Sequence, residues 1–277
     1  MAEIITAPWL LGLLGDGRVL RSPSPMMHQA ALSEARLSGY YLPLKVSRRE
    51  LKTALDGLLA LGFGGLNVTA PHKEAVIPHL FSLSPAARII GAVNTLKATD
   101  LGYEGHNTDA PGFAAAYLKD LSPGQKAVLY GAGGAARAVI QAFKSLDLEI
   151  LITARNFEAA GKLAGEFHQK AVPLAEIGAC SPCSIVVNAT SASYAADLDP
   201  APNFPVSPGG LVIDLNYGRP DSYWSRLAAK NGSRFSDGLP MLAQQACLSF
   251  NIWTRAEISV KPFTQALSVY MEKGLNK

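Results

Sequence analysis

Lys73 and Asp109 are the two residues of this 277-residue chain whose types and surroundings best suit them to chemistry. Lys73 ends the stretch Asn67-Val68-Thr69-Ala70-Pro71-His72-Lys73, and Asp109 ends Asn107-Thr108-Asp109. An amine and a carboxylate that meet one ligand can exchange and orient a proton, which is general acid–base catalysis. The plainer interpretations are an exposed surface lysine and an aspartate that caps a helix.

The surrounding pattern predicts the elements that position these side chains. Apolar and polar residues alternate in Leu66-Asn67-Val68-Thr69, which predicts a strand with two hydrogen-bonding side chains on one face. That face could instead be the solvated side of an edge strand. Pro71 is typical of the first turn of a helix, so we expect a helix there with Lys73 near its start. The positive end of a helix dipole disfavours an ammonium, so this amine could exchange a proton near neutral pH.

A second motif lies in the middle of the chain. The apolar strand predicted at Lys126–Tyr130 runs into Gly131-Ala132-Gly133-Gly134-Ala135-Ala136, which matches G-x-G-x-x-A before an apolar helix. Gly131 permits a tight turn, Gly133 lets the backbone approach a pyrophosphate, and Ala136 allows close packing of helix and strand. We therefore predict dinucleotide binding, with a purely structural glycine turn as the alternative.

Arg155 indicates which dinucleotide is bound. It follows the strand predicted at Leu148–Ile152, where NAD-binding proteins usually carry an acidic residue for the ribose hydroxyl. An arginine there favours a 2′-phosphate, so the cofactor is predicted to be NADP(H). Glu158 comes slightly later, and we expect it to face solvent on the next helix.

Strand and helix signals alternate along the chain and predict an α/β fold. Apolar strands recur at 127–130, 148–152, 185–188 and 211–215, with a shorter one at 234–236, which is typical of a doubly wound Rossmann-type parallel sheet. The first hundred residues predict an α/β domain of their own. It contains a helix capped by Ser24, a strand through Leu42, Leu44 and Val46, and a hairpin around Asp100-Leu101-Gly102.

The chain resembles the shikimate dehydrogenase family from Leu14 to Trp253. The segments that carry the resemblance are Ser22-Pro23-Ser24-Pro25-Met26-Met27-His28, Asn67 to Lys73, Gly91-Ala92-Val93-Asn94-Thr95, Asn107-Thr108-Asp109, Gly131 to Ala138, Asn188-Ala189-Thr190-Ser191, and Asp237-Gly238-Leu239-Pro240-Met241-Leu242-Ala243-Gln244-Gln245.

The resemblance implies an NADP-dependent alcohol dehydrogenase that reversibly reduces 3-dehydroshikimate to shikimate in aromatic amino-acid biosynthesis. The resemblance also implies that Lys73 carries the proton to or from the ring oxygen and that Asp109 orients Lys73. It implies substrate contacts from Ser22, Asn67, Thr69, Asn94, Tyr217 and Gln245. It implies cofactor contacts from Gly131, Ala132, Gly133, Gly134, Ala135, Arg155, Asn156, Thr190 and Gly238. It also returns the C-terminal helices, residues 239–277, to a substrate-binding domain at 1–109, beside an NADP-binding domain at 110–238.

Two departures from the family pattern leave alternatives open. Leu20 stands where we expect the family to place a second serine ahead of Ser22, and Ala154-Arg155-Asn156 replaces Asn-Arg-Thr. The missing hydroxyl favours, as an alternative, a divergent relative that acts on quinate or another cyclic hydroxy acid. A non-catalytic dinucleotide sensor is a third possibility, which the presence of both Lys73 and Asp109 disfavours.

Composition limits the classes of protein to which the chain could belong. A net charge of +3 with 17% charged residues is too small to indicate a protein that binds nucleic acid. A content of 48% hydrophobic residues suffices for two hydrophobic cores. Three cysteines do not predict a disulfide framework, and Cys180-Ser181-Pro182-Cys183 lacks a second pair, so no metal is expected. Glu3 and Asp16 make a signal peptide at the N-terminus unfavourable, and no apolar run is long enough to span a membrane. We expect a cytoplasmic monomer or homodimer that acts on a small molecule.

Overall fold

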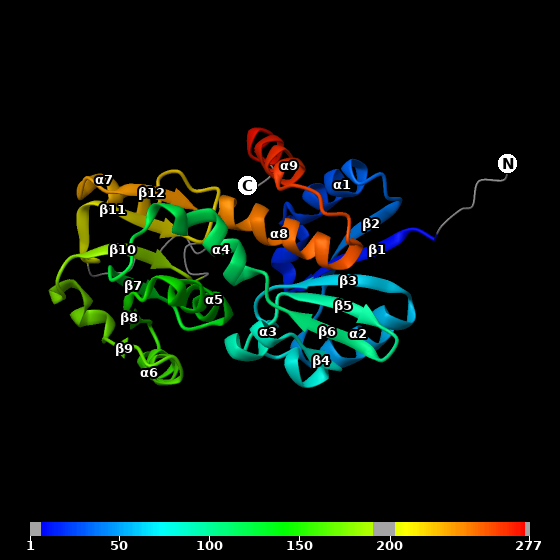
Figure 1. The fold of residues 1–277 in the computed structure, drawn as a ribbon, viewed down its shortest axis with the longest axis horizontal. Helices are drawn as coiled ribbons and strands as arrows, with labels where there is room; N and C mark the ends of the chain where they lie inside the picture. The colour runs from blue at the N-terminus through cyan, green and yellow to red at the C-terminus, as the bar shows by residue number, and fades with distance from the viewer. Residues whose placement is uncertain (1–6, 191–202, 275–277) are drawn as a thin grey trace. The chain divides into compact units, whose positions relative to one another are not determined.

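The computed structural model describes residues 7–190 and 203–274 (Figure 1). Glu3 and Ser191, which the sequence singled out, lie outside these ranges. The chain divides into two compact units. The first unit is Met1–Thr108 with Ala243–Lys277, and the second unit is Asp109–Leu242. Each contains a six-stranded sheet, so each can be described by itself.

The first unit is built on a mixed sheet with strand order β2-β1-β3-β5-β6-β4. Its strands are β1 (Trp9–Gly15), β2 (Gly39–Lys45), β3 (Phe63–Val68), β4 (Ser82–Leu83), β5 (Thr95–Thr99) and β6 (Gly102–His106). Its helices are α1 (Ser24–Glu34), α2 (Leu51–Ala60), α3 (Pro85–Ile90) and α9 (Lys261–Glu272), with most of α8 (Leu239–Thr254). β1 pairs in parallel with β2 and β3, whereas β5 is antiparallel to β3 and β6.

Successive side chains along the strands of the first unit point to opposite faces of the sheet, and both faces are buried. Leu66 and Val68 join an apolar cluster with Leu51 and Leu55 of α2, while Asn67 between them points to the opposite face. On that opposite face, His28 of α1 stacks on Tyr41 of β2 with ring centroids 4.2 Å apart. Trp253 of α8 and Phe263 of α9 complete an aromatic cluster around His28. The helices that return from the C-terminus therefore cover the face that carries the polar strand residues.

The second unit is a parallel sheet with strand order β12-β11-β10-β7-β8-β9. Its strands are β7 (Lys126–Tyr130), β8 (Glu149–Thr153), β9 (Lys170–Ala171), β10 (Cys183–Asn188), β11 (Val206–Asp214) and β12 (Arg234–Asp237). Its helices are α4 (Asp109–Tyr117), α5 (Gly134–Phe143), α6 (Phe157–Glu166) and α7 (Tyr223–Lys230). Counted from β7, this is the order 3-2-1-4-5-6 of the Rossmann fold.

Both faces of the second sheet are buried. Because side chains alternate along a strand, every second residue belongs to the same face. Ala127 and Leu129 of β7 pack with α4, α5 and α6, whereas Val128 and Tyr130 pack with Trp224 and Leu227 of α7. Strands that are covered on both faces consist of continuous apolar runs, so these strands could be predicted from the sequence.

The α/β architecture with a doubly wound Rossmann-type sheet is confirmed, but three local predictions were wrong. Pro71 begins no helix: residues 70–76 form turns, and the next helical segment is a 3-10 helix at Ile77–His79. The N-cap of α1 is Pro23, and Ser24 is the first helical residue. The strand with Leu42 and Leu44 ends at Lys45, before Val46. Among the described residues, no helix is both long and apolar enough to cross a membrane.

Candidate active site

Lys73 is half-buried in the turn that follows β3, and its segment is tied to the sheet by main-chain bonds. Thr69 N–H donates to Leu14 O at 2.9 Å, and Val93 N–H donates to Lys73 O at 2.8 Å. Because no helix starts at Pro71, the helix dipole invoked for Lys73 is absent from its own segment. Asp109 is buried and is the first residue of α4 in the second unit.

Asn67 of β3 is the hub of a buried polar network in the first unit. Its Oδ1 accepts from Tyr41 Oη at 2.8 Å, and its Nδ2 donates to Asn94 O at 3.1 Å and to Ser249 Oγ at 3.0 Å. Both hydrogens of the amide are therefore directed at protein acceptors. Asn67 is therefore fixed in place by residues of β2, β5 and α8 and by the chain just before β5.

Asn94 joins this network to the start of β5 and to α8. Its Oδ1 accepts from Thr108 N–H at 2.7 Å and from Thr95 Oγ1 at 3.0 Å, and its Nδ2 donates to Gln245 Oε1 at 3.2 Å. Ser249 Oγ lies 2.7 Å from Thr95 Oγ1 and 3.0 Å from Thr108 Oγ1. The structure thus places two predicted substrate residues, Asn94 and Gln245, in direct contact.

Helix α8 meets the network through residues spaced four apart. Gln245 contacts Asn94, Ser249 contacts Asn67, and Trp253 Nε1 donates to Leu96 O at 2.8 Å. Residues at i, i+4 and i+8 lie on one side of a helix, so this polar and aromatic spacing was a signal for Ser249 that the sequence reading missed.

Ser22 has a second hydroxyl beside it, that of Ser24, although Leu20 offers none. Ser22 Oγ donates to Ser24 Oγ at 3.0 Å, and Ser24 N–H donates back to Ser22 Oγ at 3.2 Å. Leu20 is exposed on the 3-10 helix Gly17–Arg21. The hydroxyl pair is formed by alternate residues around Pro23, and Ser24, read from the sequence as a helix cap, is the missed member.

The glycine turn of the second unit follows β7 as predicted. Gly131 has φ +131° and donates its N–H to Thr153 O at 2.8 Å. A Cβ on Gly131 would lie 3.0 Å from the carbonyl carbon of Ala189, so a side chain does not fit there. Gly133 is the N-cap of α5, and a Cβ on it would meet no atom within 4 Å. Ala132, Gly134 and Ala135 are partly exposed beside it, and the first N–H groups of a helix have no partner within the helix.

Arg155 and Asn156 follow β8, and both are exposed. Asn156 is the N-cap of α6, where its Oδ1 accepts from Ala159 N–H at 3.2 Å. The charge of Arg155 acts on Tyr130, lowering a pKa that burial raises overall. Arg155 is therefore a cation at the carboxyl end of the central strands.

A buried carboxylate organises the loops after β10 and β11. Asp214 Oδ1 accepts from Asn188 Nδ2 at 2.8 Å, and from Asn216 N–H at 3.1 Å and Nδ2 at 2.8 Å. Asn188 Oδ1 accepts from the Thr190 hydroxyl at 2.8 Å. Burial raises the pKa of Asp214, although these hydrogen bonds oppose the shift. Sequence reasoning missed this network, which carries the predicted cofactor residue Thr190.

Gly238 and Tyr217 follow the carboxyl ends of two neighbouring parallel strands, Gly238 after β12 and Tyr217 after β11. Gly238 is buried, donates its N–H to Asn216 O at 3.0 Å, and has no room for a Cβ because the backbone of Leu215 lies against it. Tyr217 is half-buried. Within residues 7–190 and 203–274, no group of three or more His, Cys, Asp or Glu could hold a metal ion. All three cysteines are free thiols.

Two family models match the chain, one after the other. The model described as shikimate dehydrogenase substrate binding domain matches residues 15–96. The model described as shikimate / quinate 5-dehydrogenase matches residues 114–196.

Known proteins with this arrangement are similar over nearly the whole chain. Shikimate dehydrogenase (NADP(+)) of Desulforamulus reducens is 38% identical over 272 residues, which cover 92% of this chain and 94% of that protein. Shikimate 5-dehydrogenase from Thermus thermophilus, solved in complex with NADP(H) and shikimate, is 35% identical with a TM-score of 0.83, covering 94% of this chain and 99% of that chain. Quinate dehydrogenase from Corynebacterium glutamicum, solved in complex with NAD, is 30% identical with a TM-score of 0.83, covering 95% and 99%.

Proposed function

The chain belongs to the shikimate dehydrogenase family, and we propose that it catalyses the reversible NADP-dependent reduction of 3-dehydroshikimate to shikimate, a step of aromatic amino-acid biosynthesis. The observation that carries the proposal is the likeness to an NADP-dependent shikimate dehydrogenase over 92% of the chain. The polar network of the first unit and the glycine turn of the second unit supply the two kinds of site that this reaction needs.

We assign recognition of the ring to uncharged hydrogen-bonding groups of the first unit. A polyhydroxylated ring needs many donors and acceptors, and Ser22, Thr69, Asn94 and Gln245 provide them without burying charge. Ser24 adds the second hydroxyl beside Ser22. We assign Asn67 a supporting role, because its amide hydrogens are directed at Asn94 and Ser249. Tyr217 of the second unit is proposed as a further substrate contact.

Lys73 and Asp109 are proposed to handle the proton. As the ketone is reduced, the ring oxygen gains negative charge, and the Lys73 ammonium donates a proton to it. In the reverse direction the neutral amine takes the proton back. The Asp109 carboxylate orients the proton-bearing groups. NADPH, when bound, supplies the hydride, which is chemistry that no side chain can provide.

The second unit fits a dinucleotide phosphate. The N-terminus of the ten-residue helix α5 opens at Gly133, where no atom occupies the space of a Cβ. Backbone N–H groups in that position bind a pyrophosphate, and residues 131–135 are proposed to form its cradle. Arg155 is proposed to bind the 2′-phosphate, and Asn156, Thr190 and Gly238 to complete the cofactor site.

Initial rates of NADP⁺ reduction with shikimate, quinate and related cyclic hydroxy acids test the function. We expect the highest kcat/KM with shikimate and NADP⁺, and a lower value with NAD⁺. Dinucleotide binding without turnover of any acid in the panel would contradict the proposal and favour a non-catalytic sensor.

Preference for quinate is the second candidate, and it is favoured by the 30% identity to a quinate dehydrogenase. The hydroxyl of Ser24 beside Ser22 supports shikimate over quinate, because it offers the group that Leu20 lacks. A higher kcat/KM for quinate than for shikimate would establish it. A cytoplasmic location and a monomeric or homodimeric state stay predictions.

A further inference from the structure

The segment that carries Lys73 is held at both ends by main-chain bonds. Thr69 N–H is bonded to the end of β1 at Leu14 O, and Lys73 O is bonded to Val93 N–H. Between these points a local main-chain bond joins His72 N–H to Thr69 O, at 2.9 Å. That bond closes the turn without attaching it to a neighbouring element, so side chains contribute to the position of the residues just before Lys73.

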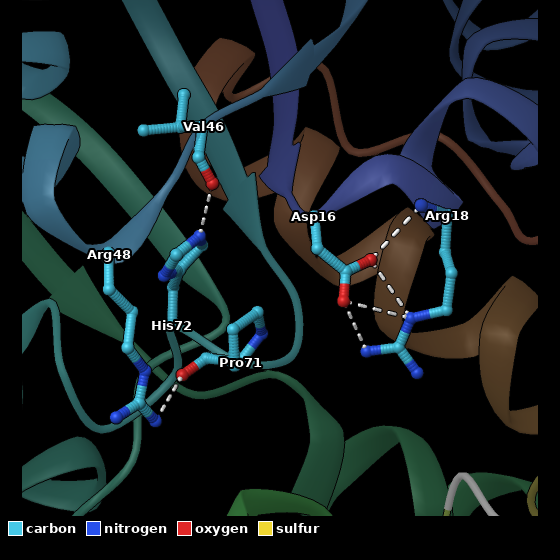
Figure 2. A network of polar contacts seen from close by, with 6 residues as sticks. All are labelled: Asp16, Arg18, Val46, Arg48, Pro71 and His72. Atoms are coloured by element: carbon cyan, nitrogen blue, oxygen red, sulfur yellow. Dashed lines mark hydrogen bonds and ion pairs between the residues drawn. The ribbon is translucent and has the colours of Figure 1, made fainter.

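His72 and Arg48 tie these residues to the chain that follows β2 (Figure 2). His72 Nε2 lies 2.9 Å from Val46 O, and because a carbonyl oxygen can only accept, Nε2 carries a hydrogen. Arg48 Nη2 donates to Pro71 O at 3.3 Å. Val46 N–H in turn donates to Gly15 O at 2.9 Å, so the acceptor of the histidine bond is itself held to β1.

The His72 bond is the stronger of the two anchors. His72 is completely buried, whereas Arg48 is exposed and its bond is long. Because the His72 side chain is shielded from water, loss of this bond leaves its Nε2–H buried without a partner. His72 Nδ1 is also buried and has no hydrogen-bond partner within the described part of the chain. The bond to Val46 O is thus the directional contact that orients the ring.

Asp16 is the nearby carboxylate that could have competed for this histidine. Figure 2 shows Asp16 turned instead toward Arg18. Its Oδ1 accepts from Arg18 N–H at 3.0 Å and from Arg18 Nε at 2.9 Å, and its Oδ2 lies 2.8 Å from Arg18 Nη2. The carboxylate is therefore engaged by its own arginine, and the partner of the imidazole is the carbonyl of Val46.

We propose that His72 is a positioning residue for Lys73, acting through its Nε2–H bond to Val46 O. The bond fixes the residue immediately before the lysine and so sets the point from which the amine reaches the substrate oxygen. This inference rests on the proposed function. Misplacement of a reacting group by about 1 Å can lower turnover on the order of 100-fold, so an anchor one residue away from Lys73 matters for the rate.

A pair of amide variants separates positioning from simple packing. His72→Gln can bring an amide N–H near the place of Nε2, whereas the shorter His72→Asn puts it near Nδ1 and cannot reach Val46 O. His79→Gln is the matched control, because His79 is an exposed histidine six residues after Lys73. Each variant is assayed for kcat and KM with shikimate and for NADP⁺ affinity. Hydrogen exchange of the peptide that contains residues 69–76 gives a readout apart from activity.

We expect His72→Asn to lower kcat roughly 10- to 100-fold with NADP⁺ affinity unchanged, and to speed exchange of residues 69–76. His72→Gln should recover most of both, and His79→Gln should match the wild type. The inference is overturned if His72→Asn keeps the wild-type kcat, or if His72→Gln loses as much as His72→Asn. Those results would leave the proposed function intact, whereas a wild-type protein that oxidises no cyclic acid would refute the function itself.

Discussion

The polar interiors of the two units are built from different chemistry. In the first unit, Asn67 and the residues it contacts form a buried network of amides and hydroxyls. In the second unit, a carboxylate, Asp214, collects three N–H donors from Asn188 and Asn216. Uncharged groups are cheaper to bury than a carboxylate, which needs several donors to offset its desolvation.

One buried titratable group in each unit makes stability depend on pH, and the two dependences have opposite signs. Burial lowers the pKa of His28 in the first unit from 6.5 to about 3. The unfolded chain therefore binds a proton first, and stability is lost as pH falls from about 6.5 toward 3. Burial raises the pKa of Asp214 in the second unit, so there the unfolded chain ionises first and stability falls as pH rises above the usual carboxyl range.

Lys73→Ala should have the largest effect and should be confined to chemistry. Loss of a general acid–base group lowers kcat by roughly 10²- to 10⁴-fold, while NADPH affinity stays near normal because the proposed cofactor residues lie in the second unit. Steady-state kinetics and cofactor titration measure the two quantities. Lys52→Ala is the control, because Lys52 is exposed and pairs with Asp56 on α2. An unchanged kcat would remove Lys73 from the mechanism.

Exchanging amide and carboxylate at the two network centres tests the contrast directly. Asn67→Asp places a buried carboxylate against Asn94 O and removes two N–H donors, so the free energy of unfolding should fall by about 3 to 5 kcal/mol. Asp214→Asn keeps an oxygen that can accept the three N–H bonds and removes the charge, so the change should stay below about 1 kcal/mol. Urea unfolding at pH 7 measures both. An equal loss of unfolding free energy in the two variants would show that charge does not distinguish the Asn67 network from the Asp214 network.

His28→Phe should remove an acid-labile part of the first unit's stability. Phenylalanine can keep the stack on Tyr41 but does not titrate. Between pH 7 and pH 4 the wild type should lose about 3 kcal/mol that the variant retains. Urea unfolding followed by tryptophan fluorescence measures this in a Trp224→Phe background, because the two remaining tryptophans, Trp9 and Trp253, both belong to the first unit and the Trp253 ring centroid is 5.4 Å from that of His28. Parallel pH curves for variant and wild type would be inconsistent with a neutral buried His28, and His79→Gln should leave the curve unchanged.

Arg155→Asp should have the smallest effect of the series and should act only on the cofactor. A charge-assisted bond to the 2′-phosphate is lost and a repulsion is gained, so NADPH should bind on the order of 10-fold more weakly while NADH changes little. Titrations with both dinucleotides measure the difference, and Lys162→Asp on the exposed side of α6 is the control. Equal weakening of NADPH and NADH would argue against recognition of the phosphate by Arg155.

The second unit could be predicted in more detail than the first. Its strands are apolar runs covered on both faces, and its glycine turn lies between one strand and one helix, so the signals are local. The two-residue strand β9 escaped notice because it is too short to form a pattern. In the first unit, Pro71 misled because its position after a strand also suits a turn. Ser24 was taken for a helix cap because its contact with Ser22 is not visible from propensity alone.

The residue types at the candidate site, the order of the two units along the chain and the apolar runs of the parallel sheet were determined by the sequence alone, because each depends on neighbours within one element. The tertiary structure decided which polar groups are occupied by the protein itself. Asn67 meets Ser249 across 182 positions, and His72 meets Val46 across 26. Hydrogen bonds between residues so far apart depend on strand register and helix docking, which no local pattern encodes.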